Sequence, residues 1–247
     1  MLSKSQIKLI KSLSQKKFRN MHGLFVAEGV KVIKEFLKSS IELHALYAIA
    51  DIFHIEEGES HIISEKELKS ISNLKTPQTA LAVFKIPKSK ASFSPEGLKL
   101  ALDGLRDPGN LGTIIRLCDW FDVKDIFCST DTVDCFNSKV VQATMGSLAR
   151  VNLHYTDLPK FLSETPQPTF AAVMNGESVY QNEAITQDAI IVLGNEANGI
   201  SEEIENLVSH KICIPQFGKI KDTESLNVAT ASAILLSEFR RRYFIET

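Results

Sequence analysis

The chain has 247 residues, of which 44% are hydrophobic and 23% are charged, and its formal net charge is −2. This length can form one large domain or two modest ones, and the composition is typical of an ordinary soluble globular protein. No apolar run approaches the roughly 20 residues that a membrane helix requires. The nearly balanced charge argues against a protein that coats nucleic acid indiscriminately.

The first 27 residues contain no acid, a feature shared with organelle transit peptides. They lack the arginine enrichment of such peptides and the apolar core of a signal peptide, so we expect a cytoplasmic protein. The four cysteines show no metal-ligand spacing and lie in apolar neighbourhoods, at Cys118, Cys128, Cys135 and Cys213. We therefore expect buried, reduced thiols and no metal.

Basic residues are concentrated at the N-terminal end. Residues 1–38 contain nine lysines and arginines but only two acids, whereas the rest of the chain is acidic on balance. The stretch "SKSQIKLIKSLSQKKFR" places apolar residues near helical spacing with lysines around them. Two interpretations stay open at this point: the lysines form the solvated face of a small helix, or they contact the phosphates of a nucleic acid.

Strands and helices are predicted to alternate along roughly the first 86 residues, which indicates a small α/β unit. The predicted strands are residues 24–29, 41–50 and 79–86, and the predicted helices are residues 30–39 and 64–72. The stretch "PKSKASFSPEG" (residues 87–97) breaks this pattern with two prolines and a glycine, and it is the best candidate for an interdomain linker.

The second part of the chain alternates more regularly. The predicted strands are residues 98–105, 125–129, 151–155, 169–174, 189–194 and 211–215. The predicted helices are residues 111–121, 133–149, 157–164, 201–209 and 225–242. The run "AIIVLG" is continuously apolar, as expected of a strand covered on both faces. This pattern predicts a parallel α/β sheet that binds its ligand at the loops after the strands.

Three of these strands end in loops rich in small or amide residues: "DPGNLG", "GNEANG" and "PQFGKIKDTESLN". Because the carboxyl ends of parallel strands lie at one edge of a sheet, the three loops can converge there. Glycine and asparagine let the backbone approach a ligand closely. The chain lacks the glycine patterns of dinucleotide and P-loop sites and has no nucleophile elbow. The residues alone therefore indicate a small ligand with adenosine-like or amide-binding edges.

In their order and spacing, "DPGNLGTIIR", "IVLGNEANGIS" and "IPQFG…SLNVATA" resemble the three motifs of the SpoU branch of SPOUT RNA methyltransferases, a TrmH-like family. "ATMGSLARVNL" resembles a segment between these motifs, and "KKFRNMHGLFVAEG" with "TPQTALAVF" resembles the family's L30e-like substrate-binding domain. The resemblance covers nearly the whole chain. It implies an α/β fold with an L30e-like RNA-binding domain at residues 1–90 and a methyltransferase domain with a parallel sheet at residues 91–247. It also implies a trefoil knot, which sequence physics alone does not suggest because knots are nearly absent among folds.

The family transfers a methyl group from S-adenosyl-L-methionine to a ribose 2′-hydroxyl of RNA. The resemblance therefore implies this cofactor, an rRNA or tRNA substrate with rRNA slightly favoured, and a homodimer formed through the C-terminal domain. By matching the motifs, it implies catalytic roles for Asn110, Arg116, Glu196, Ser225 and Asn227. It implies cofactor binding by Met174, Leu193, Gly194, Asn195, Ile214, Ser225 and Leu226. RNA contacts are expected from Lys16, Lys17, Arg19 and Arg116.

Two features depart from the family pattern. Six residues, "KIKDTE", separate Gly218 from Ser225, where the family usually has three. Ala197 stands where a second glycine is common, which removes conformational freedom at that point. Neither departure deletes a charged group, so they affect the expected pocket shape rather than the chemistry.

Methyl transfer from a sulfonium is a single in-line displacement, which requires alignment but no protein nucleophile or metal. Since a guanidinium stays protonated in nearly all protein settings, we expect Arg116 to stabilise the developing alkoxide and to bind an adjacent phosphate. Glu196 either orients Arg116 or Asn110, or caps a turn. Asn227 and Ser225 can cap the last helix while contacting substrate or cofactor.

Two other functions fit part of the pattern. A non-catalytic RNA-binding or assembly protein would retain the same fold, and binding of S-adenosyl-L-methionine would separate it from an enzyme. A nucleotide-dependent oxidoreductase lacks its glycine fingerprint here and would require NAD binding.

Overall fold

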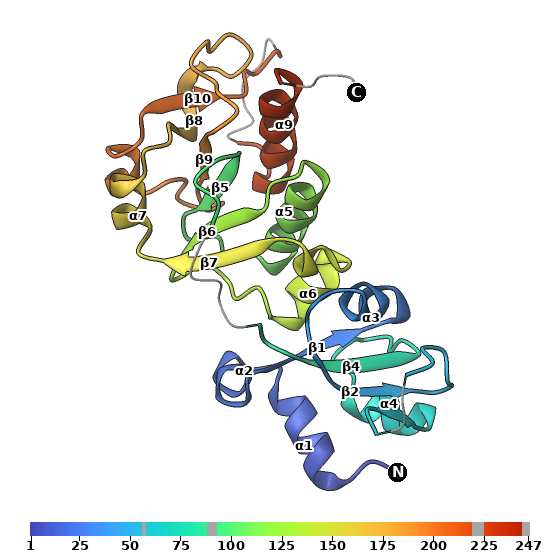
Figure 1. Cartoon of the computed structure of the whole chain (residues 1–247). Helices are drawn as coiled ribbons and strands as arrows, with labels where there is room; N and C mark the ends of the chain where they lie inside the picture. Colours follow the sequence, from blue (N-terminus) through green and yellow to red (C-terminus); the bar gives the residue numbers. More distant parts are fainter. Residues whose placement is uncertain (56–57, 88–92, 219–224, 244–247) are drawn as a thin grey trace. The chain divides into compact units, whose positions relative to one another are not determined.

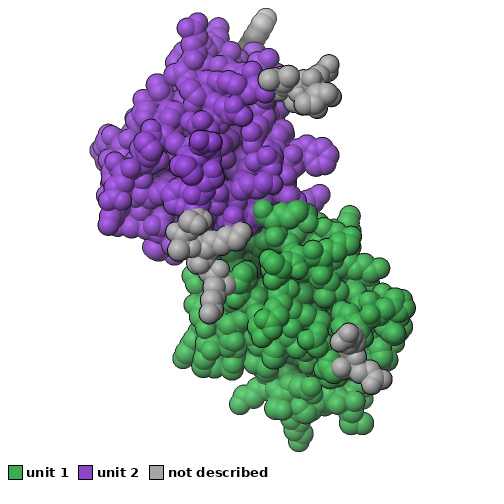
Figure 2. Space-filling view, in the orientation of Figure 1, with its two compact units in different colours: residues 1–89, 134–150 green, residues 90–133, 151–247 purple. Residues whose placement is uncertain are grey.

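The computed structural model describes residues 1–55, 58–87, 93–218 and 225–243. The chain forms two compact units, which have different colours in Figure 2. The first contains residues 1–89 and 134–150, and the second contains residues 90–133 and 151–247. The predicted linker lies partly outside the described residues. No helix in the described ranges combines the length and the apolar character of a membrane span.

The first unit is built on a four-stranded sheet with the order β1-β4-β2-β3. Its strands are β1 (Leu24–Glu28), β2 (Leu43–Ala48), β3 (Ser60–Ile62) and β4 (Ala80–Lys85). Its helices are α1 (Lys4–Ser12), α2 (Lys16–His22), α3 (Val30–Leu37), α4 (Glu65–Ile71) and α6 (Ser138–Thr144), followed by the 3₁₀ turn η1 (Ser147–Ala149). The predicted α/β alternation is confirmed here. β3 escapes prediction because three residues cannot show a periodicity.

The basic N-terminal stretch forms two helices rather than one. A capping box begins α1: the Ser3 hydroxyl accepts a hydrogen bond from the Gln6 N–H at 3.2 Å, and the Gln6 side chain accepts one from the Ser3 N–H at 2.9 Å. α2 ends at Gly23, whose φ of 64° is the left-handed conformation that commonly ends a helix. The periodicity of the sequence extends across the turn between them and therefore does not reveal it.

Arg19 of α2 holds this turn in place. Its side chain is 2% exposed, and Nη1 donates to the carbonyl oxygens of Leu13 and Ser14, each at 2.9 Å. Nε donates to Asp134 Oδ2 at 3.0 Å, and Nη2 bonds to the same carboxylate. A guanidinium bound in this way inside the protein is not presented to a phosphate. The structure thus corrects the expectation that Arg19 contacts RNA: Arg19 is a buried structural residue.

Residues 134–150 pack into the first unit, although the sequence places them in the second predicted domain. The Phe136 ring lies on Phe25 of β1, with centroids 4.8 Å apart, and Phe25 also contacts Phe36 and Phe84. These aromatic side chains form the core between β1, β4 and α3. The segment is therefore part of that core and not a surface attachment.

The helix predicted over residues 133–149 is interrupted after α6. Met145 and Gly146 have φ values of 52° and 97°, which end the helix before the short turn η1. A Cβ atom at Gly146 would lie 2.4 Å from the Cβ of Glu35, so only glycine lets this turn approach α3. Arg150 then donates from Nη1 to Glu35 Oε2 at 2.8 Å.

The described part of the second unit contains six parallel strands in the order β10-β8-β9-β5-β6-β7. The strands are β5 (Lys99–Leu102), β6 (Asp125–Ser129), β7 (Asn152–Thr156), β8 (Thr169–Ser178), β9 (Ile190–Leu193) and β10 (His210–Cys213). The helices are α5 (Pro108–Trp120), α7 (Leu158–Glu164), α8 (Glu202–Glu205) and α9 (Val228–Arg241). In Figure 1, α5 and α9 lie side by side on one side of this sheet and α7 lies on the other. The predicted parallel α/β sheet is confirmed.

Helix caps explain where α5 and α9 begin. The Asp107 side chain accepts a hydrogen bond from Asn110 N–H at 2.7 Å, and Pro108 occupies the first turn, so α5 starts earlier than its apolar periodicity predicts. The Asn227 Oδ1 accepts from the N–H groups of Ala229 and Thr230 at 2.9 and 3.2 Å, which confirms Asn227 as the cap of α9.

Buried charges lie at the amino-terminal edge of this sheet, away from the strand ends that carry the motif loops. Lys99 is 1% exposed and donates from Nζ to Gln167 Oε1 at 2.7 Å, and burial lowers its pKa. Burial raises the pKa of Asp125, but hydrogen bonds with His154 and Asn152 outweigh it, so the pKa is lowered on balance. The buried charges of Lys99 and Asp125 at this edge are therefore satisfied by partners within the protein.

Arg19→Ala should lower the free energy of unfolding by about 3–5 kcal/mol, because it leaves the Asp134 carboxylate without its buried partner. Lys17→Ala is the matched control: Lys17 is exposed on the same helix, and its loss should cost no more than about 0.5 kcal/mol. Urea unfolding followed by circular dichroism measures both. Equal stabilities of the two variants would contradict the structural role of Arg19.

Candidate active site

A cavity of about 870 Å³ opens at the carboxyl ends of β8, β9 and β10. It is lined by residues 172–175, 193–200, 212–218 and 225–228, together with Glu205, Ala231 and Leu235. Of the three motif loops predicted to converge at one sheet edge, the second and third line this cavity, and the first does not. The "KIKDTE" insertion occupies positions 219–224 and lies outside the described residues.

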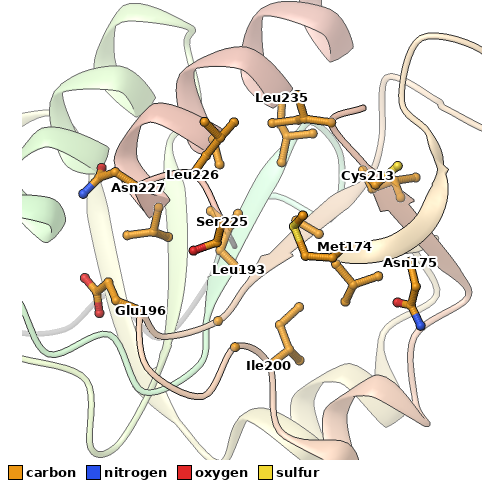
Figure 3. A pocket seen from close by; sticks show the side chains of 18 of the residues that line it. Met174, Asn175, Leu193, Glu196, Ile200, Cys213, Ser225, Leu226, Asn227 and Leu235 are labelled. Carbon is orange, nitrogen blue, oxygen red and sulfur yellow. The ribbon is translucent and has the colours of Figure 1, made fainter. Parts of the chain in front are cut away.

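The cavity has apolar walls and polar ends. Figure 3 shows Met174, Leu226 and Leu235 along the walls, with Glu196 and Asn227 at one end. All of the predicted cofactor-binding residues line this cavity: Met174, Leu193, Gly194, Asn195, Ile214, Ser225 and Leu226. Met174 is 58% exposed and Leu226 is 47% exposed, so both present apolar surface to whatever enters.

Gly194 is the tightest point of the cavity wall. A Cβ atom there would lie 2.0 Å from the carbonyl carbon of Gly199 and 2.3 Å from the nitrogen of Ile200, and neither backbone atom can move aside. The loop closes on itself because Asn195 and Gly199 exchange hydrogen bonds at 3.0 and 2.9 Å. The absence of a side chain at position 194 is therefore what permits this loop.

Ala197 does not disturb the loop. The left-handed conformation that the loop needs is supplied by Gly199, with φ of 68°. The Asn195 Oδ1 accepts from the N–H groups of Ala197 and Asn198, both at 2.8 Å, and so fixes the turn. The departure from the family pattern at Ala197 thus costs no strain.

Three polar side chains from three separate motifs form a hydrogen-bonded chain. Asn227 donates from Nδ2 to Asn110 Oδ1 at 3.0 Å, and Asn110 donates from Nδ2 to Glu196 Oε1 at 2.5 Å. Both oxygen and nitrogen of the Asn110 amide are used, so its orientation is determined by its partners. The Glu196 carboxylate orients Asn110, which is one of the two roles expected for it. The sequence motifs predict that these groups meet but do not specify the bonds.

Arg116 does not line the cavity. It lies six residues after Asn110 on α5, which rotates it to a different side of the helix. The buried side of α5 comprises Leu111, Gly112, Ile114, Ile115 and Cys118, whereas Arg116 is exposed. Within the described residues, no ion pair or hydrogen bond holds its side chain. The structure of one chain therefore brings together the other predicted catalytic residues but leaves Arg116 outside them.

The residues that line the cavity fit S-adenosyl-L-methionine. The volume lies within the usual range of about 300–1,000 Å³ for small-molecule sites. The apolar walls and the backbone around Gly194 suit a flat adenine, and Asn175 lies at the opposite end from Glu196, where it can meet a polar group (Figure 3). Asn175 has no motif signal in the sequence beyond its place directly after Met174 at a predicted strand end.

Lys16 and Lys17, two of the residues expected to bind RNA, are exposed on α2 in the first unit. Among the described residues, no group of three His, Cys, Asp or Glu side chains could hold a metal ion. Cys118, Cys128 and Cys135 are buried, and Cys213 is partly exposed in the cavity wall.

Two family models match the chain. The SpoU rRNA Methylase family matches residues 97–237, and the MRM3-like substrate binding domain matches residues 4–82. A curated relative, 23S rRNA (guanosine(2553)-2′-O)-methyltransferase RlmP of Bacillus subtilis, is 27% identical over 95% of this chain and 96% of its own length.

Solved structures agree with these matches. A TrmH-family protein from Porphyromonas gingivalis is 38% identical, with a TM-score of 0.88 over 98% of this chain and 99% of its own. An AdoMet-bound rRNA methyltransferase from Sinorhizobium meliloti is 28% identical, with a TM-score of 0.87 over 99% of this chain and 97% of its own. The predicted fold class is confirmed. The chain belongs to the SpoU rRNA methylase family.

Proposed function

We propose that the chain methylates a ribose 2′-hydroxyl of rRNA, with S-adenosyl-L-methionine as the methyl donor. The observation that carries this proposal is the cavity at which two motif loops converge and at whose end Glu196 and Asn227 are each hydrogen-bonded to Asn110. The name of the Bacillus subtilis relative specifies 23S rRNA, which supports rRNA over tRNA. The bacterial origin of that relative supports a cytoplasmic location.

The bound cofactor supplies the electrophilic methyl group. The chain's own residues supply position: the apolar walls hold a flat ring, and Gly194 lets the loop after β9 close on itself and form part of those walls. The Asn110 amide, held at both of its ends, presents a fixed dipole beside the cavity at no cost of reorganisation. Alignment of this kind is the main requirement of an in-line displacement.

Arg116 provides the positive charge that the nascent alkoxide requires, and it does so at a homodimer interface. The exposed side of α5 carries Arg116 and, one turn later, Trp120, which is 83% exposed. A tryptophan so placed is typical of a surface that a partner covers. A second copy packed there would bring Arg116 into a water-poor setting, in which a guanidinium stabilises an oxyanion more strongly.

Residues 1–90, the predicted substrate-binding domain, recognise the RNA. Lys16 and Lys17 contact phosphates, and Arg19 supports them by fixing the turn before α2. Ammonium groups on flexible stems suit a folded polyanion whose phosphates are read by shape.

The wild-type protein should transfer labelled methyl groups from S-adenosyl-L-methionine to 2′-hydroxyls of rRNA prepared from cells that lack it. Arg116→Ala should reduce kcat by about 10²–10³-fold, as expected when one oxyanion-stabilising donor is removed, without weakening cofactor binding. Arg106→Ala is the control, because Arg106 is an exposed arginine before α5 that pairs with Asp131 at 3.8 Å. Transfer to tRNA alone would redirect the proposal, and cofactor binding without any transfer would favour a non-catalytic RNA-binding protein.

Gly194→Ala should abolish binding of S-adenosyl-L-methionine, measured by calorimetry, because its Cβ collides with the backbone at 2.0 Å. Ala197→Gly in the same loop should keep the affinity for S-adenosyl-L-methionine within about threefold, because the loop requires neither a side chain nor a positive φ at this position. Unchanged affinity in Gly194→Ala would place the cofactor elsewhere.

The double change Lys16→Ala, Lys17→Ala should weaken rRNA binding and lower the slope of log affinity against log salt by about 1 to 2. Lys38→Ala is the control, because Lys38 belongs to the same unit and its Nζ lies 3.7 Å from Glu35 Oε1, with which it forms an ion pair. Filter binding at several salt concentrations measures both. An unchanged slope in the double variant would show that the two lysines do not contact phosphates.

A further inference from the structure

Two exposed aromatic rings lie at the cavity: Phe217 is in the third motif loop and Tyr180 is outside the motifs, and neither is one of the predicted site residues. Phe217 lines the cavity and is 84% exposed, and Tyr180 is 42% exposed. Their ring centroids are 6.4 Å apart, with an angle of 34° between the planes. Leaving large apolar rings in water forgoes the free energy of burying them, so their exposure requires an explanation.

The sheet brings the two rings together. Ser178 at the end of β8 pairs with Cys213 at the end of β10, and Val179 N–H donates to the Cys213 carbonyl at 2.9 Å. Tyr180 follows β8 by two residues, and Phe217 follows β10 by four. The pair therefore projects from the same edge of the sheet as the cavity.

The backbone that carries Tyr180 is rigidly held. The Arg242 guanidinium donates to the carbonyl oxygens of Val179 and Asn182 at 2.7 and 2.5 Å. Asn182 is 2% exposed and donates from Nδ2 to Glu177 Oε2 at 2.6 Å. The turn is thus fixed on both sides while the Tyr180 ring stays in solvent. A rigid backbone that presents an exposed aromatic ring costs little entropy when a flat ligand stacks on it.

The chemistry around the pair favours a base over a phosphate or a second protein copy. Glu177 and Glu183 lie in the exposed segments beside Tyr180, and these carboxylates repel phosphates. Gln181 and Glu183 are exposed, so the rings form no continuous apolar patch of the kind that a dimer buries. The π-face of a nucleic acid base needs no cation and stacks on either ring.

We propose that Tyr180 and Phe217 form a stacking platform for an unpaired base that flanks the methylated ribose. The inference rests on the proposed function, because RNA must bring that ribose to this cavity. Sequence-specific RNA recognition targets unstacked bases in loops and bulges, where a base can turn onto an aromatic side chain. The platform therefore selects a target nucleotide in a loop rather than in a continuous helix.

Tyr180→Ala and Phe217→Ala should each raise the KM for the undermethylated rRNA about tenfold, which is about 1.4 kcal/mol and of the size expected for one lost base stack. Tyr180→Phe and Phe217→Tyr retain the rings and should restore wild-type KM. Leu207→Ala, at another exposed apolar residue of the same unit, should have no effect. The slope of affinity against salt should stay unchanged, since stacking releases no counterions.

Three results would overturn the platform: a wild-type KM in both alanine variants, weakened binding of S-adenosyl-L-methionine by calorimetry, or dissociation of the oligomer in analytical ultracentrifugation. The second would assign the rings to the cofactor and the third to a second copy. Direct filter binding of the same rRNA separates the inference from the proposed function. If the wild type binds rRNA but transfers no methyl group, the proposed function fails, and the affinities of the alanine variants still decide the platform.

Discussion

The close approach of two backbone segments at Gly194 is the constraint on which the cavity depends. The loop after β9 turns back on itself so tightly that a single Cβ atom at this position would overlap the backbone of Gly199. The turn is closed by backbone bonds and by the Asn195 side chain, so contacts within the chain hold its shape. Preformed cavities of this kind bind a rigid cofactor with little entropic cost. The loop after β10 then contributes only further residues that line the cavity.

The site depends on amide groups that hydrogen bonds hold in place, and not on charged groups alone. Asn110 is bound through both atoms of its amide, by groups that come from the loop after β9 and from the start of α9. Asn227 has two duties, since its Oδ1 caps α9 while its Nδ2 reaches Asn110. The stability of a helix terminus and the orientation of the site thus depend on one side chain. A substitution there would change folding and function together, and kinetics alone could not separate the two.

Local signals in the sequence predict most of this architecture. Glycines, amides and caps act over a few residues, so the loops and the parallel strands between them can be recognised from the printed chain. Contacts between residues that are far apart in the sequence cannot be recognised in this way. Arg19 looks like a phosphate ligand in a basic stretch, and its buried partner Asp134 lies 115 residues away. The outward direction of Arg116 is likewise set by which side of α5 is buried, a choice that the chain's fold makes and a motif does not record.

The insertion of residues 134–150 into the first unit has a consequence for the order of folding. During synthesis the chain emerges from its N-terminus, and domains generally fold as units in that order. The last strand of the first sheet ends at residue 85. The partners of Phe25 and Arg19, which are Phe136 and Asp134, are translated only after the first two strands of the second sheet. The first unit therefore matures late on the ribosome, together with the beginning of the second unit. A nascent chain that stops at residue 90 leaves its aromatic core open and an arginine without its carboxylate.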